Sequence, residues 1–169
     1  EGRTVIITGA GGGLGRAYAL AFAEQGANVV VNDIRRQAAE QVVGEILEAG
    51  GQAIANADDI TTVATAQHIV DAALAAFGEV HVLVNNAGIL RDRMFISLSE
   101  EDWDAVMRVH LKGHFCLANI LGKRWRDQAK AGQPVDARII ITSSGAGLQG
   151  SVGQSNYSAA KGGIAALTL

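Results

Sequence analysis

The sequence has 169 residues, of which 49% are apolar and 18% charged, so it is too apolar for an intrinsically disordered chain and has the length of one domain. Its net charge of -3 argues against nucleic-acid binding, which normally uses a basic surface. The single cysteine, Cys116, excludes an intrachain disulfide and a cysteine-based zinc site. No apolar run approaches the roughly 20 residues that cross a bilayer, so we expect a cytoplasmic protein with no membrane contact.

Short apolar runs alternate along the chain with longer segments in which apolar residues recur at helical spacing. The runs predict strands at residues 4–8, 28–32, 52–56, 80–84 and 138–142. Helices are expected between them, including one long fourth helix through Trp103 and Leu121 and a last helix that begins near Ser155. All the strands except the weaker third one are continuously apolar, which is typical of strands covered on both faces. The alternation predicts a single domain over residues 1–169, built on a doubly wound parallel α/β sheet.

A glycine-rich loop, Thr8 to Gly15, leaves the first strand and opens the first helix. Glycine allows a sharp turn and the close approach of a ligand, and the free N–H groups of a helix start suit a pyrophosphate. Asp33 ends the second strand, where a carboxylate can accept hydrogen bonds from the adenosine ribose and repel a 2′-phosphate. The pattern favours NAD over NADP, although Arg35 and Arg36 could soften this preference. A tight turn without a ligand, and an N-cap or turn role for Asp33, remain as alternatives.

A phenol and an ammonium group are four residues apart at Tyr157 and Lys161. On a helix, positions i and i+4 share a face, so the cation would stabilise the phenolate form of the tyrosine. The phenol could then exchange a proton with a substrate hydroxyl or carbonyl. Ser144 closes the fifth strand and could hydrogen-bond the same substrate oxygen. A tyrosine and a lysine at this spacing often occur by chance, but their place after a fifth strand that ends in serine favours a catalytic site.

With these parts in order, the sequence resembles the short-chain dehydrogenase/reductase superfamily from Arg3 to its last residue. The motifs that carry the resemblance are Thr8–Gly15, Asp59-Ile60, Asn85–Gly88, Ser144, Tyr157 and Lys161. Within the superfamily, the sequence is most similar to the hydroxyacyl-CoA dehydrogenase part of peroxisomal multifunctional enzymes and their bacterial relatives. The resemblance implies a Rossmann-type sheet with strand order 3-2-1-4-5. It also implies that the C-terminal strand or strands and the substrate segment lie outside these 169 residues.

The resemblance implies that NAD is the cofactor, and it assigns roles to individual residues. The cofactor-binding residues would be Gly9, Gly13, Leu14 and Gly15 at the pyrophosphate, Asp33 at the adenosine ribose, Asp59 and Ile60 at adenine, and Asn86, Ala87 and Gly88 along the cleft. Tyr157 would be the general acid and base, and Ser144 would orient the substrate oxygen. Tyr157 and Lys161 would both also contact the cofactor, and Lys161 would bind the nicotinamide ribose and stabilise the phenolate. Hydride would pass between the cofactor and the substrate carbon.

His110 stands where many members of the superfamily have an asparagine that helps a water hold the active-site lysine. It could take part in the same proton relay, because a histidine donates and accepts similar hydrogen bonds. Alternatively, it is an ordinary core histidine on an apolar helix face with Trp103 and Leu117. A metal site shared with His114 would lack a carboxylate ligand, so no metal is expected.

The sequence therefore predicts an enzyme that transfers a hydride between NAD and a secondary alcohol or ketone. A 3-hydroxyacyl thioester, possibly of coenzyme A, is the first choice of small-molecule substrate. The alternatives are an acyl-carrier-protein thioester, a steroid, a sugar, or a non-catalytic NAD-binding module. By analogy with the superfamily, we expect a homodimer or homotetramer that pairs through the helices near 101–125 and from 155 onward.

Overall fold

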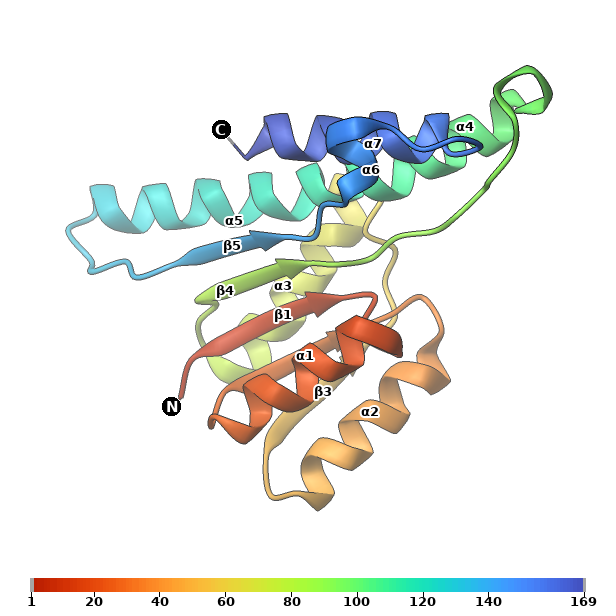
Figure 1. Ribbon diagram of the computed structural model, residues 1–169. Coiled ribbons are helices and arrows are strands. Elements are labelled where there is room, and N and C mark those ends of the chain that lie inside the picture. The colour runs from red at the N-terminus through yellow and green to blue at the C-terminus, as the bar shows by residue number, and fades with distance from the viewer. Residues whose placement is uncertain (1, 169) are drawn as a thin grey trace.

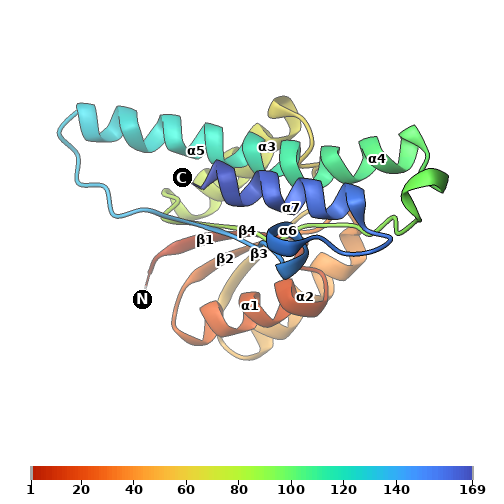
Figure 2. The ribbon, with the colours of Figure 1, turned by 45° about the horizontal axis from the view of Figure 1, so that its top comes forward.

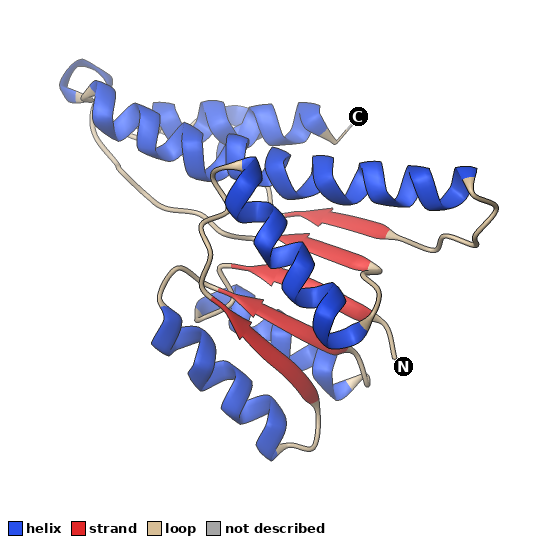
Figure 3. Ribbon diagram, turned by 180° about the vertical axis from the view of Figure 1, so that it is seen from behind, coloured by secondary structure: helices blue, strands red, loops and turns tan. Residues whose placement is uncertain are grey.

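The computed structural model describes residues 2–168, which form a five-stranded parallel sheet with helices on both faces (Figures 1 and 3). The strands are β1 (Thr4–Thr8), β2 (Asn28–Asn32), β3 (Gln52–Asn56), β4 (Val82–Asn85) and β5 (Arg138–Ile141). Their order is β3-β2-β1-β4-β5, which confirms the predicted topology. The first three strands have the predicted bounds, whereas β4 begins and ends later than expected and β5 ends one residue earlier.

Helices cover the sheet in two layers, as Figure 2 shows. One layer consists of α1 (Gly13–Glu24) and α2 (Arg36–Glu48), and the other contains α3 (Val63–Phe77) and α5 (Gly113–Lys130). Alternate residues of each central strand face opposite layers, so Ile7 packs in the α1 and α2 core while Ile6 packs in the α3 and α5 core. Because both faces of β1, β2 and β4 are covered, these strands are buried along nearly their whole length.

The predicted long fourth helix is present and unbroken, but it is not α-helical throughout. The structure has α4 (Glu100–Met107), a π-helical segment η2 (Arg108–Lys112) and then α5. Wider π turns often occur at functional sites inside longer helices. Here the segment contains the buried His110, and it delivers Gly113 so close to Ile60 that an added Cβ would lie 2.7 Å from the isoleucine Cδ1. Helical periodicity cannot reveal this insertion, because it depends on contacts with distant residues.

The apolar run at β5 predicts cover on both faces, but a C-terminal strand outside these 169 residues would leave β5 as an open edge, and among the described residues β5 is such an edge. Ile139 and Ile140 are 39% and 46% exposed, because β5 is the edge of the sheet and pairs with β4 alone. An open groove runs beside Ile140 and is lined on its other side by Phe22 of α1. After β5 the chain forms the short α6 (Gly145–Gln149) and then α7 (Ser155–Leu167), which packs against α4 and η2.

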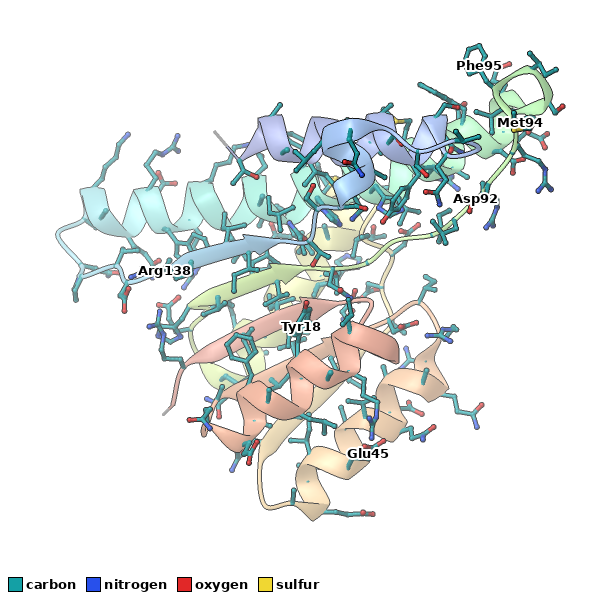
Figure 4. All side chains as sticks on the ribbon, in the orientation of Figure 1. Tyr18, Glu45, Asp92, Met94, Phe95 and Arg138 are labelled. Atoms are coloured by element: carbon teal, nitrogen blue, oxygen red, sulfur yellow. The ribbon has the colours of Figure 1, made fainter. Side chains whose placement is uncertain are left out.

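The segment between β4 and α4 extends away from the sheet and contains the 3-10 turn η1 (Phe95–Ser97). Figure 4 shows Met94 and Phe95 at its far end, where their side chains are 59% and 73% exposed. Closer to the sheet, the segment runs beside the start of α7, and the Arg93 N–H donates to the Gly153 carbonyl. No helix within residues 2–168 is long and apolar enough to cross a membrane.

Candidate active site

A cavity of about 510 Å³ lies where the parallel strands β1 to β4 reach their carboxyl ends. Ligands of open α/β sheets bind at this end of the strands. Seven of the residues predicted to bind the cofactor line this cavity, and they are Gly9, Asp33, Asp59, Ile60, Asn86, Ala87 and Gly88. The other five do not line it: Gly13, Leu14 and Gly15 lie at the start of α1, and Tyr157 and Lys161 lie on α7. The structure therefore gathers the predicted adenosine and cleft residues in one place.

The loop after β1 has glycine where the backbone leaves no room for a side chain. Gly9 has a φ of +62°, and an added Cβ would lie 2.8 Å from the Cα of Ala87. At Gly15, a Cβ would lie 2.3 Å from the carbonyl oxygen of Gly9. Thr8 locks the same loop to the end of β4, since its Oγ1 accepts from the N–H groups of Asn86 and Ala87, each at 3.0 Å. Sequence reasoning gave Thr8 no individual role.

Asn86 has its side-chain amide committed to the glycine loop rather than to the cavity. Its Nδ2 donates to the carbonyl oxygens of Thr8 at 3.1 Å and Gly9 at 3.3 Å. Asp59 is likewise committed, because its carboxylate accepts from the backbone N–H of Thr61 at 2.9 Å and from its hydroxyl at 2.8 Å. Both residues therefore shape the cavity through internal hydrogen bonds.

Asp33 is nearly buried and is held by four hydrogen bonds from two residues. The backbone N–H of Gly11 donates to Oδ2 at 3.0 Å, and the Arg35 backbone N–H donates to Oδ1 at 3.0 Å. The Arg35 guanidinium adds contacts of 3.1 Å and 3.2 Å to the two carboxylate oxygens. Burial alone would raise the pKa of Asp33, but these hydrogen bonds outweigh it and the pKa is lowered. The charged carboxylate thus has a turn role as well as a place in the cavity, so the two sequence interpretations are compatible.

The catalytic candidates lie beyond this cavity, on α6 and α7. Lys161 is 2% exposed, and its Nζ donates to the carbonyl of Thr142 at the end of β5. The same nitrogen lies 5.7 Å from the centre of the Tyr157 ring, so the two side chains share a helix face as predicted. Burial lowers the pKa of Lys161 to about 8.

Ser144 caps the start of α6, where its Oγ accepts from the Ala146 N–H at 3.2 Å. The turn that carries it is pressed onto α7, because a Cβ at Gly147 would lie 2.6 Å from the backbone carbonyl carbon of Lys161. The neighbouring Ser143 hydroxyl donates to the Lys161 carbonyl at 3.2 Å. The strand end, α6 and the lysine turn of α7 therefore form one packed unit around the predicted catalytic residues.

His110 connects this unit to the cavity. Its ring meets the Tyr157 ring edge-on, with the centres 5.2 Å apart, and its Nε2 lies 2.9 Å from the N and 2.8 Å from the O of Ile89. Burial lowers its pKa to about 4, so the imidazole is neutral at pH 7. Gly88 leaves room for it, because a Cβ there would lie 2.3 Å from the His110 Cε1. The buried ring and its contact with Tyr157 are compatible with both a core histidine and a proton relay, and the relay stays a prediction.

His114 lies one turn further along, with its ring centre 6.4 Å from that of His110. Its Nε2 pairs with the carbonyl of Ala87 at 3.0 Å, and burial lowers its pKa to about 4. In the described part of the chain, no group of three or more histidine, cysteine or acidic side chains is placed to hold a metal ion.

The chain is similar in sequence to known enzymes. Residues 3–169 match the family model described as short chain dehydrogenase. The chain is 49% identical to the peroxisomal multifunctional enzyme type 2 of Mus musculus, over 99% of this chain and 23% of that protein. It is 50% identical to a hydroxyacyl-CoA dehydrogenase of Mycobacterium tuberculosis, over the whole chain and 55% of that protein. The predicted similarity to multifunctional enzymes and their bacterial relatives is thereby confirmed.

A solved structure gives the same result for the fold. The 3-ketoacyl-(acyl-carrier-protein) reductase of Brucella melitensis, in complex with NADH, is 34% identical and superposes with a TM-score of 0.90. The match covers 99% of this chain and 68% of the reductase chain. The 169 residues span about a quarter of the length of the Mus musculus enzyme and about half of that of the Mycobacterium tuberculosis enzyme. The family match over nearly the whole chain establishes that the chain belongs to the short chain dehydrogenase family of oxidoreductases.

Proposed function

We propose that the protein containing this chain oxidises a secondary alcohol with NAD, or reduces the corresponding ketone with NADH. The observation that carries the proposal is the buried Lys161 ammonium beside Tyr157, which His110 links to the cavity at the carboxyl ends of the strands. Burying a cation lowers the stability of the fold, and groups whose pKa is shifted by burial cluster at active sites.

The cavity suits a dinucleotide because Gly9 and Asp33 both line it, so the loop backbone comes close to the cavity and a charged acceptor lies beside it. The Asp33 charge would accept hydrogen bonds from the ribose hydroxyls and repel a 2′-phosphate. Arg35, which the sequence left as a possible partner for that phosphate, is already paired with Asp33. This pairing makes Arg35 less available to a 2′-phosphate, and the NADH in the Brucella melitensis reductase is consistent with a preference for NAD.

In the proposed reaction, Tyr157 takes the proton of the substrate hydroxyl during oxidation and returns it during reduction. Lys161 stabilises the phenolate, and Ser144 donates a hydrogen bond that holds the substrate oxygen in place. When bound, NAD supplies the nicotinamide ring that accepts the hydride. His110 holds the Ile89 backbone and the edge of the Tyr157 ring.

For the substrate, we propose a 3-hydroxyacyl thioester of coenzyme A. The support comes from a relative named as a hydroxyacyl-CoA dehydrogenase and from a multifunctional enzyme of the same similarity. An acyl-carrier-protein thioester is the second choice, supported by the Brucella melitensis reductase. The expected homodimer or homotetramer stays a prediction.

The test is NADH formation by the full-length protein with 3-hydroxybutyryl-CoA, compared with NADP and with a simple secondary alcohol. Tyr157→Phe keeps the ring but removes the proton donor, and we expect kcat to fall by about 10² to 10⁴. Binding of NAD by calorimetry should be nearly unchanged in this variant. Near wild-type turnover by Tyr157→Phe would refute the mechanism, and NAD binding without turnover by the wild-type protein would favour a non-catalytic module.

A further inference from the structure

Asn156 is a fully buried polar residue that directly precedes Tyr157 in the first turn of α7. No catalytic or cofactor role assigned above involves it. A buried amide must find hydrogen-bond partners, since an unsatisfied one costs stability. The hydrogen-bond partners of Asn156 therefore indicate which segments its side chain holds together.

The side chain of Asn156 joins three segments that are far apart in the sequence. Its Nδ2 donates to the carbonyl of Arg91 at 3.1 Å, in the segment after β4, and to that of Asp102 in α4 at 3.4 Å. Its Oδ1 accepts from the Tyr157 backbone N–H at 2.8 Å. One side chain thus connects the tyrosine backbone to both the segment after β4 and α4, the helix that leads to His110.

The hydrogen bond from the Tyr157 N–H to the Asn156 side chain satisfies a backbone donor at the start of α7. The first N–H groups of a helix have no partner within it, and an N-cap side chain usually accepts from one of them. In α7 the N-cap is Gln154, whose side chain makes no capping bond. Asn156 satisfies the tyrosine N–H instead, so the orientation of the first turn depends on where its own amide is anchored.

We propose that Asn156 is a positioning residue, which sets the Tyr157 phenol relative to the cleft by anchoring the first turn of α7 to the Arg91 and Asp102 carbonyls. The inference rests on the proposed function, because it assumes that Tyr157 exchanges a proton with substrate. It also explains why an amide is buried there, since an amide supplies both the acceptor and the two donor bonds that the junction uses.

The experiment compares Asn156→Ala, Asn156→Ser and Gln154→Ala in the full-length protein. Gln154 is the matched control, because its amide also crosses to the segment after β4, with Nε2 donating to Asp92 at 3.0 Å, but at an exposed site. Figure 4 places Asp92 on that segment, between the sheet and the projecting tip. The readouts are kcat and KM with 3-hydroxybutyryl-CoA, the Kd for NAD, and Tm.

For Asn156→Ala we expect kcat to fall by about tenfold or more, because a displacement of about 1 Å can cost up to 10²-fold in rate. The Kd for NAD should stay within about twofold, because the Asp33 end of the cleft does not contact this junction. Asn156→Ser keeps a hydroxyl that can donate one bond, so its kcat should lie between those of Asn156→Ala and the wild type. Gln154→Ala should behave as the wild type.

Two results would overturn the inference while leaving the proposed function intact. One is a kcat for Asn156→Ala within twofold of wild type when Tyr157→Phe is inactive. The other is a parallel loss of kcat, NAD affinity and Tm in both Asn156 variants, which would reveal an ordinary folding contact. A wild-type protein that binds NAD but oxidises no hydroxyacyl thioester or other secondary alcohol would instead refute the proposed function, and this inference with it.

Discussion

The two ends of the cleft hold their charged groups in different ways. At the adenosine end, Asp33 accepts four hydrogen bonds from within the chain, and they lower its pKa despite burial. At the catalytic end, Lys161 is more deeply buried, donates to one carbonyl, and has its pKa lowered to about 8. The first charge is stabilised by the fold, whereas the second is destabilised by it. A group kept at a cost to stability is typical of a functional site.

Removing the charge at the catalytic end should give the largest effect. Lys161→Met keeps a long side chain without the ammonium, and we expect kcat to fall by about 10²-fold, because the phenolate of Tyr157 loses its neighbouring cation. The assay is NADH formation by the full-length protein at saturating NAD and substrate. A kcat within a few-fold of wild type would contradict the assigned role of the lysine.

Unfolding experiments on the same variant provide the control. The folded pKa of about 8 lies below the ordinary 10.5, so between these values the unfolded chain binds the proton that the folded chain has released. The stability of the wild type should therefore rise as the pH increases from 8 to 10.5, and that of Lys161→Met should not. We expect the variant to be at least as stable as the wild type at pH 7, so its lower kcat would not reflect unfolding.

At the adenosine end, Asp33→Ala should weaken NAD binding by about 10- to 100-fold, because hydrogen bonds to a charged group contribute about 1.5–3 kcal/mol. Discrimination against NADP should relax at the same time, since the repulsive charge is gone. Calorimetry with both nucleotides measures this directly. An unchanged ratio of the two affinities would defeat the assignment of Asp33 to the ribose.

Arg35→Gln is the matched control for that variant, because it removes the guanidinium that occupies both Asp33 oxygens but keeps the carboxylate. We expect NAD affinity to stay the same or to tighten by a few-fold, as the guanidinium no longer competes with the ribose. A loss as large as that of Asp33→Ala would mean that the arginine, and not the carboxylate, binds the nucleotide.

The smallest effect concerns acid stability at the junction between the two ends, where His110 touches Tyr157. Burial lowers the pKa of His110 from 6.5 to about 4, so stability is lost as the pH falls from 6.5 towards 4, where the unfolded chain takes up protons that the folded chain does not. In urea unfolding, His110→Gln should lose about 1 kcal/mol less than the wild type between pH 7 and pH 5. An equal loss in both proteins would show that His110 is not neutral in the fold.

Much of this arrangement is readable from local sequence. Apolar runs predicted the strands and the parallel sheet, and the family resemblance implied the strand order that the structure has. Asp33 lies at the predicted strand end, and Tyr157 and Lys161 share the predicted helix face. These features depend on residues that are neighbours in the chain or on the rules that connect parallel strands.

The features that the sequence did not predict depend on distant contacts or on the conformation of a single side chain. The π-helical turn around His110 brings Gly113 onto Ile60, and the pairing of Arg35 with Asp33 depends on a side-chain conformation. The exposure of Ile140 follows from its place on an edge strand, which an apolar run cannot distinguish from a central one. In each case the local pattern is compatible with several tertiary environments, and only packing selects one.

The most direct test of the account is a crystal structure of the full-length protein with NAD and a substrate analogue. The account predicts the adenosine ribose on Asp33 and the nicotinamide ribose on Lys161, with the analogue oxygen within hydrogen-bond distance of both the Tyr157 and Ser144 hydroxyls. NAD in another cavity, or tyrosine and serine hydroxyls that point away from the nicotinamide ring, would contradict it.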